Sequence, residues 1–489
     1  FKDSPAYLTW GAAAALIYVS PAIGGWVGDK FLGTRHTMLL GACVLTVGYA
    51  LMVVPSASSE FLFLALGVIV VGNGLFKANA GNLVRKIYEG DDTKIDSAFT
   101  IYYMAVNIGS MVSMLLTPFI KTYFNAPFHG QLTWLLGSHA AAFFGDNLGW
   151  HIAFAVSCVG LLVGLGNYAV MRHTLNHIGS EPDHQPFRLW KLLAVLAGGI
   201  IVVFISAFIL KYGNVARIFV YVAGACVVAI FAYLIAKCRH GEKAGLIIAL
   251  ILVVETVFFF IFYQQMSTSL NVFALRNVNQ SFNVFGFHLW TWDPAQFQAF
   301  NPIWIFILSP ILAFIYTHFA RRSKDLSIAA KFALGFAAVA VGFFVYGASA
   351  HFLTGPGKTT SWVMVWGYGF GSLGELLTSG LGLAFIARYV PARMGGFMMG
   401  AYFVAVGVSQ YLGGIVANFA SVPSNITDPV QMMPIYTKLF NALGVAGIIC
   451  TVIALAVLPL IRKLNAEHHE HNSGVTPVPA AAHSVTAKE

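Results

Sequence analysis

Residues 61–83 of the chain read FLFLALGVIVVGNGLFKANAGNL, an almost unbroken apolar run that contains a single charge, Lys77. A helix needs about 20 apolar residues to cross the hydrocarbon core of a bilayer. A charged side chain at that depth costs at least a few kcal/mol, so an intramembrane lysine is by default a functional candidate whose partner has to be found. The stretch therefore predicts a membrane-spanning helix that carries part of a polar site.

The composition of the whole chain indicates a membrane protein. Of its 489 residues, 58% are hydrophobic and 10% are charged, and the mean hydropathy is +0.75. A soluble globular domain has roughly 25% charged residues. Apolar segments long enough to span a bilayer predict an all-α polytopic membrane protein. They are 5–28, 36–55, 60–84, 97–123, 148–171, 188–210, 214–237, 243–270, 300–320, 328–352, 360–388, 394–421 and 434–462.

The distribution of Lys and Arg predicts the orientation. Most of the 28 cations fall in alternate loops and in the C-terminal tail, which by the positive-inside rule face the cytoplasm. The net charge of +9 follows from this bias and favours contact with the anionic lipid bilayer rather than with nucleic acid. The scheme places residue 1 outside, so we expect one further helix before it, which is missing from this chain.

Cysteine and histidine give no indication of a metal site or a cofactor. The five cysteines are odd in number and scattered through apolar segments, which argues against a disulfide framework. The tail over 466–489 contains several histidines but no helical periodicity, and we expect it to be disordered. The intramembrane polar residues include no His–Asp or Cys–His pair, so an enzyme is not expected.

Polar loops divide the chain into parts. We predict an N-terminal helical bundle over 1–171, a cytoplasmic linker with a two-helix insert over 172–242, a C-terminal six-helix bundle over 243–465 and the tail over 466–489. The insert carries no intramembrane charge, so a peripheral position is expected for it. With the missing helix restored, two six-helix bundles form the major facilitator superfamily fold, whose halves rock around a central site.

Three ionisable residues lie deep in the predicted helices, and they are Lys77, Glu255 and Glu375. Glu375 is roughly 20 Å of helix from either end of its segment and cannot snorkel, whereas Lys77 is roughly 12 Å from Arg85 and could do so in part. An isolated buried lysine loses its proton and an isolated glutamate gains one, but a close pair keeps both charges. We therefore predict that Lys77 pairs with Glu375 across the two halves. For Glu255, a proton site and an interhelical hydrogen bond are both open.

Hydrogen-bonding side chains accompany these charges. Tyr103 and Asn107 are four residues apart and share a helix face, as are Glu375 and Ser379. Any one such group can simply bond a neighbouring helix, but together they favour a ligand site. The further candidates are Tyr18, which precedes a proline, and Asn301, which opens a proline-containing segment.

Four stretches together resemble the proton-dependent oligopeptide transporter family of the major facilitator superfamily. They are GGWVGDKFLGTRHTMLLG (24–41), GNGLFKANAGNL (72–83), FTIYYMAVNIGSM (99–111) and SGLGLAFIARYVPARMGGFMMGAYF (379–403). The resemblance, of the bacterial type with two extra helices, implies a proton-coupled symporter that imports di- and tripeptides by alternating access. It also implies a bacterial inner (plasma) membrane protein with a cytoplasmic C-terminus, and we expect a monomer.

The resemblance also implies roles for individual residues. Lys77 would meet the peptide carboxylate or take part in proton coupling, and Glu375 with Ser379 would lie near the peptide amino group. The residues that would hydrogen-bond the ligand are Tyr18, Tyr103, Asn107 and Asn301. The alternative function is a carrier of nitrate or another small anion on the same fold, which would need Lys77 but not Glu375.

Overall fold

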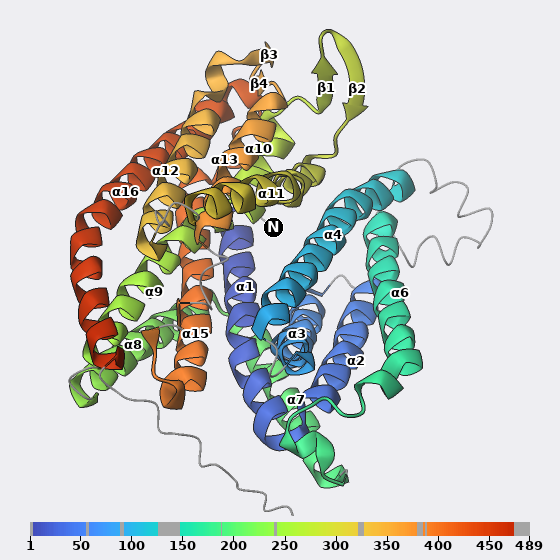
Figure 1. The fold of residues 1–489 in the computed structure, drawn as a ribbon. Helices are drawn as coiled ribbons and strands as arrows, with labels where there is room; N and C mark the ends of the chain where they lie inside the picture. The colour runs from blue at the N-terminus through green and yellow to red at the C-terminus, as the bar shows by residue number, and fades with distance from the viewer. Residues whose placement is uncertain are drawn as a thin grey trace, which may run out of the picture.

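The computed structural model describes residues 3–54, 58–88, 92–125, 147–186, 188–238, 242–320, 327–378, 385–386 and 389–473. Long helices dominate it (Figure 1). The described chain contains twelve helices that are long and apolar enough to cross a membrane. A further apolar helix, α13 (Trp362–Thr378), falls just short of that length in its described part. The predicted all-α polytopic membrane fold is confirmed.

The first half contains the helices up to residue 171. They are α1 (Asp3–Trp26), which continues into the π-helix η1 (Val27–Leu32), then α2 (Thr34–Val53), α3 (Ser59–Ile87), α4 (Asp92–Asn125) and α6 (Leu148–Met171). The short helices η3 (Arg172–Leu175) and η4 (Glu181–His184) then lead to the insert, α7 (Leu189–Lys211) and α8 (Gly213–Lys237).

The second half begins at α9 and holds the larger apolar core. Its helices are α9 (Lys243–Tyr263), α10 (Ser269–Asn277), α11 (Phe300–Ala320), α12 (Ile328–Gly347), α13, α15 (Ala392–Ala417) and α16 (Pro429–Ser473). Two small antiparallel hairpins connect some of them, β1 (Ser281–Val284) with β2 (Phe287–Thr291) and β3 (Leu353–Gly355) with β4 (Lys358–Thr359).

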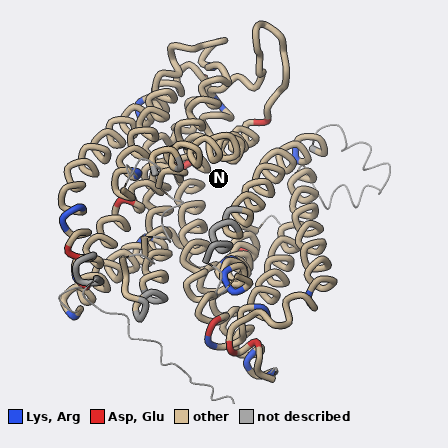
Figure 2. Tube along the Cα trace, in the orientation of Figure 1, with Lys and Arg blue, Asp and Glu red and all other residues tan. Residues whose placement is uncertain are grey.

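The charged side chains lie mainly toward the two ends of the molecule, and most of the length of the helices is uncharged (Figure 2). One end carries β1–β2, and we call it the hairpin end (Figure 1). The other carries residues 172–186, and we call it the linker end. Helix α1 of the first half packs along α15 of the second half, α7 packs against α3, and α8 packs against α15. The insert therefore contacts both halves.

At the hairpin end, polar side chains join the two halves. Arg276 at the end of α10 donates to both carboxylate oxygens of Asp3 at the start of α1, at 2.6 and 2.8 Å. Asp293 accepts from Thr122 on α4 at 2.8 Å, and Lys121 lies 3.7 Å from the same carboxylate oxygen. These contacts close the hairpin end between α1 and α10 and between α4 and the segment before α11.

At the linker end, residues 172–186 fold back onto the turn between α1 and α2. The carboxylate of Asp183 accepts from the backbone N–H groups of Ser180 and Arg35, and it lies 2.9 Å from Nδ1 of His36. Gly33 in the turn has φ +103°, and a Cβ there would overlap the Asp183 carboxylate. The sequence predicted this segment only as a polar linker, but in the structure it is bonded to the first half.

Candidate functional site

Helix α1 is built around Pro21, which has no N–H to donate to the carbonyl of Ile17. Nδ2 of Asn73 on α3 donates to that free carbonyl at 3.1 Å, and the Ser20 hydroxyl donates to it at 3.2 Å. The carbonyl that the proline leaves without a helical partner is therefore hydrogen-bonded by the neighbouring helix. Asn73 is one turn before Lys77, so the same bond fixes the part of α3 that presents the lysine.

Lys77 is exposed to solvent, and its Nζ lies 4.6 Å from the centre of the Tyr18 ring on α1. A lysine over a tyrosine face is a cation–π contact. The contact directs the ammonium group toward α1 in the interior of the bundle, rather than along α3 toward Arg85. This geometry favours a site residue over a snorkelling cation.

Glu375 belongs to a buried polar cluster in the second half. Nδ2 of Asn301, at the start of α11, donates to the Glu375 carboxylate at 2.7 Å and lies 3.0 Å from the hydroxyl of Ser372. Ser372 is three residues before Glu375 and so lies on the same face of α13, and it donates to the Asn301 carbonyl at 3.3 Å. Glu375 is 9% exposed and Asn301 is 5% exposed, so the cluster is largely shielded from solvent.

Tyrosines from both halves surround this cluster. The Glu375 carboxylate interacts electrostatically with the hydroxyls of Tyr18 on α1, Tyr103 on α4 and Tyr263 on α9. Asn107 is one turn after Tyr103, and its Nδ2 donates to the Tyr103 carbonyl at 2.9 Å. The side chains predicted from separate motifs therefore converge on one polar region between the halves.

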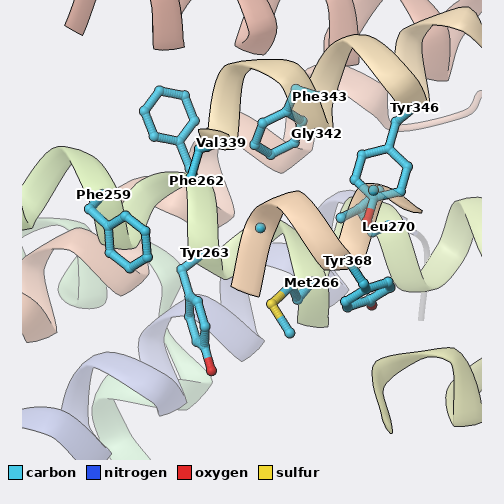
Figure 3. A pocket seen from close by; sticks show the side chains of 12 residues that line it. Phe259, Phe262, Tyr263, Met266, Leu270, Val339, Gly342, Phe343, Tyr346 and Tyr368 are labelled. Carbon is cyan, nitrogen blue, oxygen red and sulfur yellow. The ribbon is translucent and has the colours of Figure 1, made fainter. Parts of the chain in front are cut away.

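A small aromatic pocket lies beside this region within the second half, between α9, α12 and α13 (Figure 3). Its walls include Phe259, Phe262, Tyr346 and Tyr368, with Tyr263 at the side toward Glu375. In Figure 3 the hydroxyl of Tyr263 points away from the ring of Phe343, which also lines the pocket. Tyr263 thus presents a polar group on one side and an apolar ring on the other.

The structure does not bring every candidate together. Lys77 and Glu375 hold different partners in this conformation and form no ion pair, so their pairing stays a prediction. Glu255 is buried on α9 near Cys450 of α16, and its Oε2 has no hydrogen-bond partner among the described residues. Ser379 lies outside the described residues.

Two members of the polar region were missed from the sequence. Ser372 was not considered, although its spacing of three from Glu375 places it on the same helix face. Tyr263 was overlooked inside the aromatic run FFFIFYQQ, where its hydroxyl is the only polar group before the glutamines. Phe260 in the same run contacts Tyr18 with ring centres 6.0 Å apart, so part of this run lies at the interface of the halves.

Two helical halves packed around a buried acid, a cation and several tyrosines define a secondary transporter of the major facilitator type. The profile of the POT family matches residues 35–439, and the chain belongs to that family. The predicted family, fold and transport class are therefore confirmed. The chain is not an enzyme, and the nitrate alternative is not favoured.

Similar proteins agree with this assignment. The chain is 39% identical over 467 residues to dipeptide and tripeptide permease B of Salmonella typhimurium, which covers 95% of this chain and 89% of the relative. It is similar to crystal structures of tetrameric PepTSo2, with 62% identity, a TM-score of 0.83 and coverage of 95% of this chain and 92% of the other. A POT peptide transporter in complex with alafosfalin is 26% identical, with a TM-score of 0.73 and coverage of 95% and 87%.

Proposed function

We propose that this peptide transporter imports di- and tripeptides together with protons across the bacterial inner (plasma) membrane. The observation that carries the proposal is the placement of Lys77 in the first half and Glu375 in the second, on either side of one tyrosine-rich polar region. A relative is named a dipeptide and tripeptide permease, which supports the same substrate class.

A peptide suits this arrangement because its constant parts are polar and its side chains vary. Lys77 binds the peptide carboxylate and Glu375 binds the amino group. Tyr18, Tyr103, Asn107 and Asn301 hydrogen-bond the backbone or the termini, and Ser379 completes the group beside Glu375. The aromatic pocket next to Tyr263 accepts an apolar peptide side chain.

Proton coupling is assigned to Glu375. When the carboxylate is deprotonated and the peptide leaves, Lys77 is its nearest available counter-charge across the halves, and their pairing favours release. Each net positive charge that moves inward gains roughly 2.3 kcal/mol per 100 mV of membrane potential. Glu255 is the second candidate for a proton site because it is buried and its Oε2 has no hydrogen-bond partner among the described residues.

The direction of transport follows from the loop charges. We propose that the linker end and the C-terminus face the cytoplasm and that the hairpin end faces outward. The contacts of Asp3 with Arg276 and of Thr122 with Asp293 then close the outer side. The monomer expected from the sequence is part of this proposal, because a single chain supplies both charges of the site, although the similar PepTSo2 is described as tetrameric.

The test is uptake of labelled di-alanine into liposomes with an imposed inward proton gradient and a negative-inside potential. We expect accumulation that collapses with a protonophore and is lost in Lys77→Ala. Glu375→Gln should lose gradient-driven accumulation but retain exchange of internal for external peptide. Glu255→Gln removes the other buried carboxylate and so compares the two proton-site candidates, and we expect it to retain gradient-driven accumulation.

Four outcomes contradict the proposal in different ways. If Glu375→Gln accumulates di-alanine in response to the proton gradient at the wild-type rate, this residue is excluded as the proton carrier. Loss of accumulation in Glu255→Gln, with accumulation retained in Glu375→Gln, would assign proton coupling to Glu255 on α9 instead of Glu375. Normal uptake by Lys77→Ala makes the lysine a structural cation, and no di-alanine uptake by folded protein refutes the substrate class.

A further inference from the structure

A small hollow at the linker end lies well apart from the central site. It is bounded by η1, the start of α2, the segment around η4 and the start of α7. Its lining includes Phe31, Pro182 and three basic side chains, His36, Arg188 and Lys191. Two elements that are far apart in sequence, α2 and α7, therefore place basic groups around one space.

The positive charge of Arg188 and Lys191 is not neutralised by the protein that surrounds it. Neither forms an ion pair within the described part of the chain, whereas His36 is turned toward Asp183. Nζ of Lys191 lies 5.7 Å from the centre of the Phe31 ring. Glu181 of the adjoining turn is exposed and does not line the hollow.

The start of α7 adds to this positive potential. Arg188 is its N-cap residue, and no described side chain caps the free N–H groups of the first turn. Those groups carry partial positive charge and attract anions. Two cationic side chains and a helix N-terminus thus border a hollow whose lining, among the described residues, contains no carboxylate.

Aromatic side chains indicate where the hollow lies relative to the bilayer. The Phe31 ring contacts Trp26, with centres 6.4 Å apart, and Trp190, with centres 5.6 Å apart. Both tryptophans are more than half exposed, at 60% and 56%. Exposed tryptophans gather at the membrane–water interface, at the level of the lipid headgroups. Beyond them, α7 presents exposed apolar side chains such as Ile200 and Phe204.

We propose that this hollow binds the phosphate of an anionic phospholipid headgroup, with Arg188 and Lys191 as its ligands and with the acyl chains lying along α7. A basic pocket between helices on one side of the membrane is a known form of headgroup site. The lipid would link the first turn of the insert to η1 of the first half. This inference does not depend on the transported substrate or on proton coupling.

The experiment uses the full chain, delipidated in detergent, and measures its thermal unfolding midpoint with added lipid. We expect phosphatidylglycerol to raise the midpoint by several degrees and phosphatidylcholine to raise it by less. The double variant Arg188→Gln/Lys191→Gln should lose this difference. The matched control Lys237→Gln/Lys463→Gln removes the same charge elsewhere on the helical bundle and should retain it. Native mass spectrometry should show retained phosphatidylglycerol on the wild type and fewer copies on the first variant.

Three results overturn the proposal. An equal shift with both lipids, or an unchanged difference in Arg188→Gln/Lys191→Gln, shows that these residues do not select an anionic headgroup. A shift of the same size with inorganic phosphate alone shows a site for a soluble anion instead of a lipid. Because transport is not measured, failure here leaves the peptide and proton assignments unaffected.

Discussion

The hairpin end and the linker end hold their helices together in different ways. At the hairpin end, Asp3 and Arg276 bond one half to the other, and their side chains are 13% and 27% exposed. At the linker end, the side chain of Asp183 is completely buried and bonds residues 172–186 to the turn between α1 and α2 in the same half. Bonds that join the halves must break when a carrier rocks, whereas bonds within a half move with it. Partial exposure lets water replace the bonds between the halves. Burial keeps water away from the bonds within one half.

The largest expected effect is the loss of the Asp183 bonds. Asp183→Ala leaves the N–H groups of Ser180 and Arg35 without their acceptor in a buried position, which we expect to cost about 3 kcal/mol. The variant should lower the thermal unfolding midpoint in detergent more than any other change at this end. Glu181→Ala, which alters an exposed acid in the same turn, is the control and should leave the midpoint unchanged. Equal midpoints for both variants would show that the linker is not fastened by Asp183.

The second-largest expected effect comes from breaking the bonds that join the halves. Asp3→Asn and Arg276→Gln each remove one member of a two-point ion pair, which we expect to weaken closure of the hairpin end by about 1–2 kcal/mol. Uptake of di-alanine should fall about 5- to 30-fold in each single variant, since 1.4 kcal/mol corresponds to a factor of ten. The double variant should be no slower than the slower single variant, because the pair is already broken. Fully additive losses would mean that the two residues act separately.

Much of the membrane fold could be predicted from the sequence, because apolar length and loop charge are local properties of the chain. The central candidates could also be found, since a charge such as Lys77 or Glu375 is conspicuous inside an apolar helix. The partners of these charges could not. Asn301 bonds Glu375 and Tyr18 lies against Lys77 because of how helices distant in sequence pack, and no spacing along one helix encodes that.

The linker end shows the same limit more clearly. Asp183 lies in a segment rich in polar residues and proline, and its composition correctly predicts a loop outside the membrane. Its burial depends on Gly33, whose positive φ and missing side chain let the carboxylate approach a turn about 150 residues earlier. A carboxylate that bonds a turn distant in sequence cannot be predicted from the residues next to it in the chain. The segment was therefore predicted as a linker, and its attachment to the first half was missed.

The smallest expected effect is a pH dependence that only the linker end should show. Burial raises the pKa of Asp183, but hydrogen bonds from His36, Ser180 and Arg35 outweigh it and hold the pKa below the usual value. A carboxyl with a lowered pKa contributes its full stability above the unfolded value of about 3.9 and loses it as the pH falls through the folded-state pKa. The unfolding midpoint of the wild type should therefore fall more steeply below about pH 4 than that of Asp183→Asn. Glu181→Gln serves as the control and should follow the wild type. Parallel curves for the wild type and Asp183→Asn would show that the carboxylate charge is not what fastens residues 172–186, and would leave the contrast between the two ends resting on geometry alone.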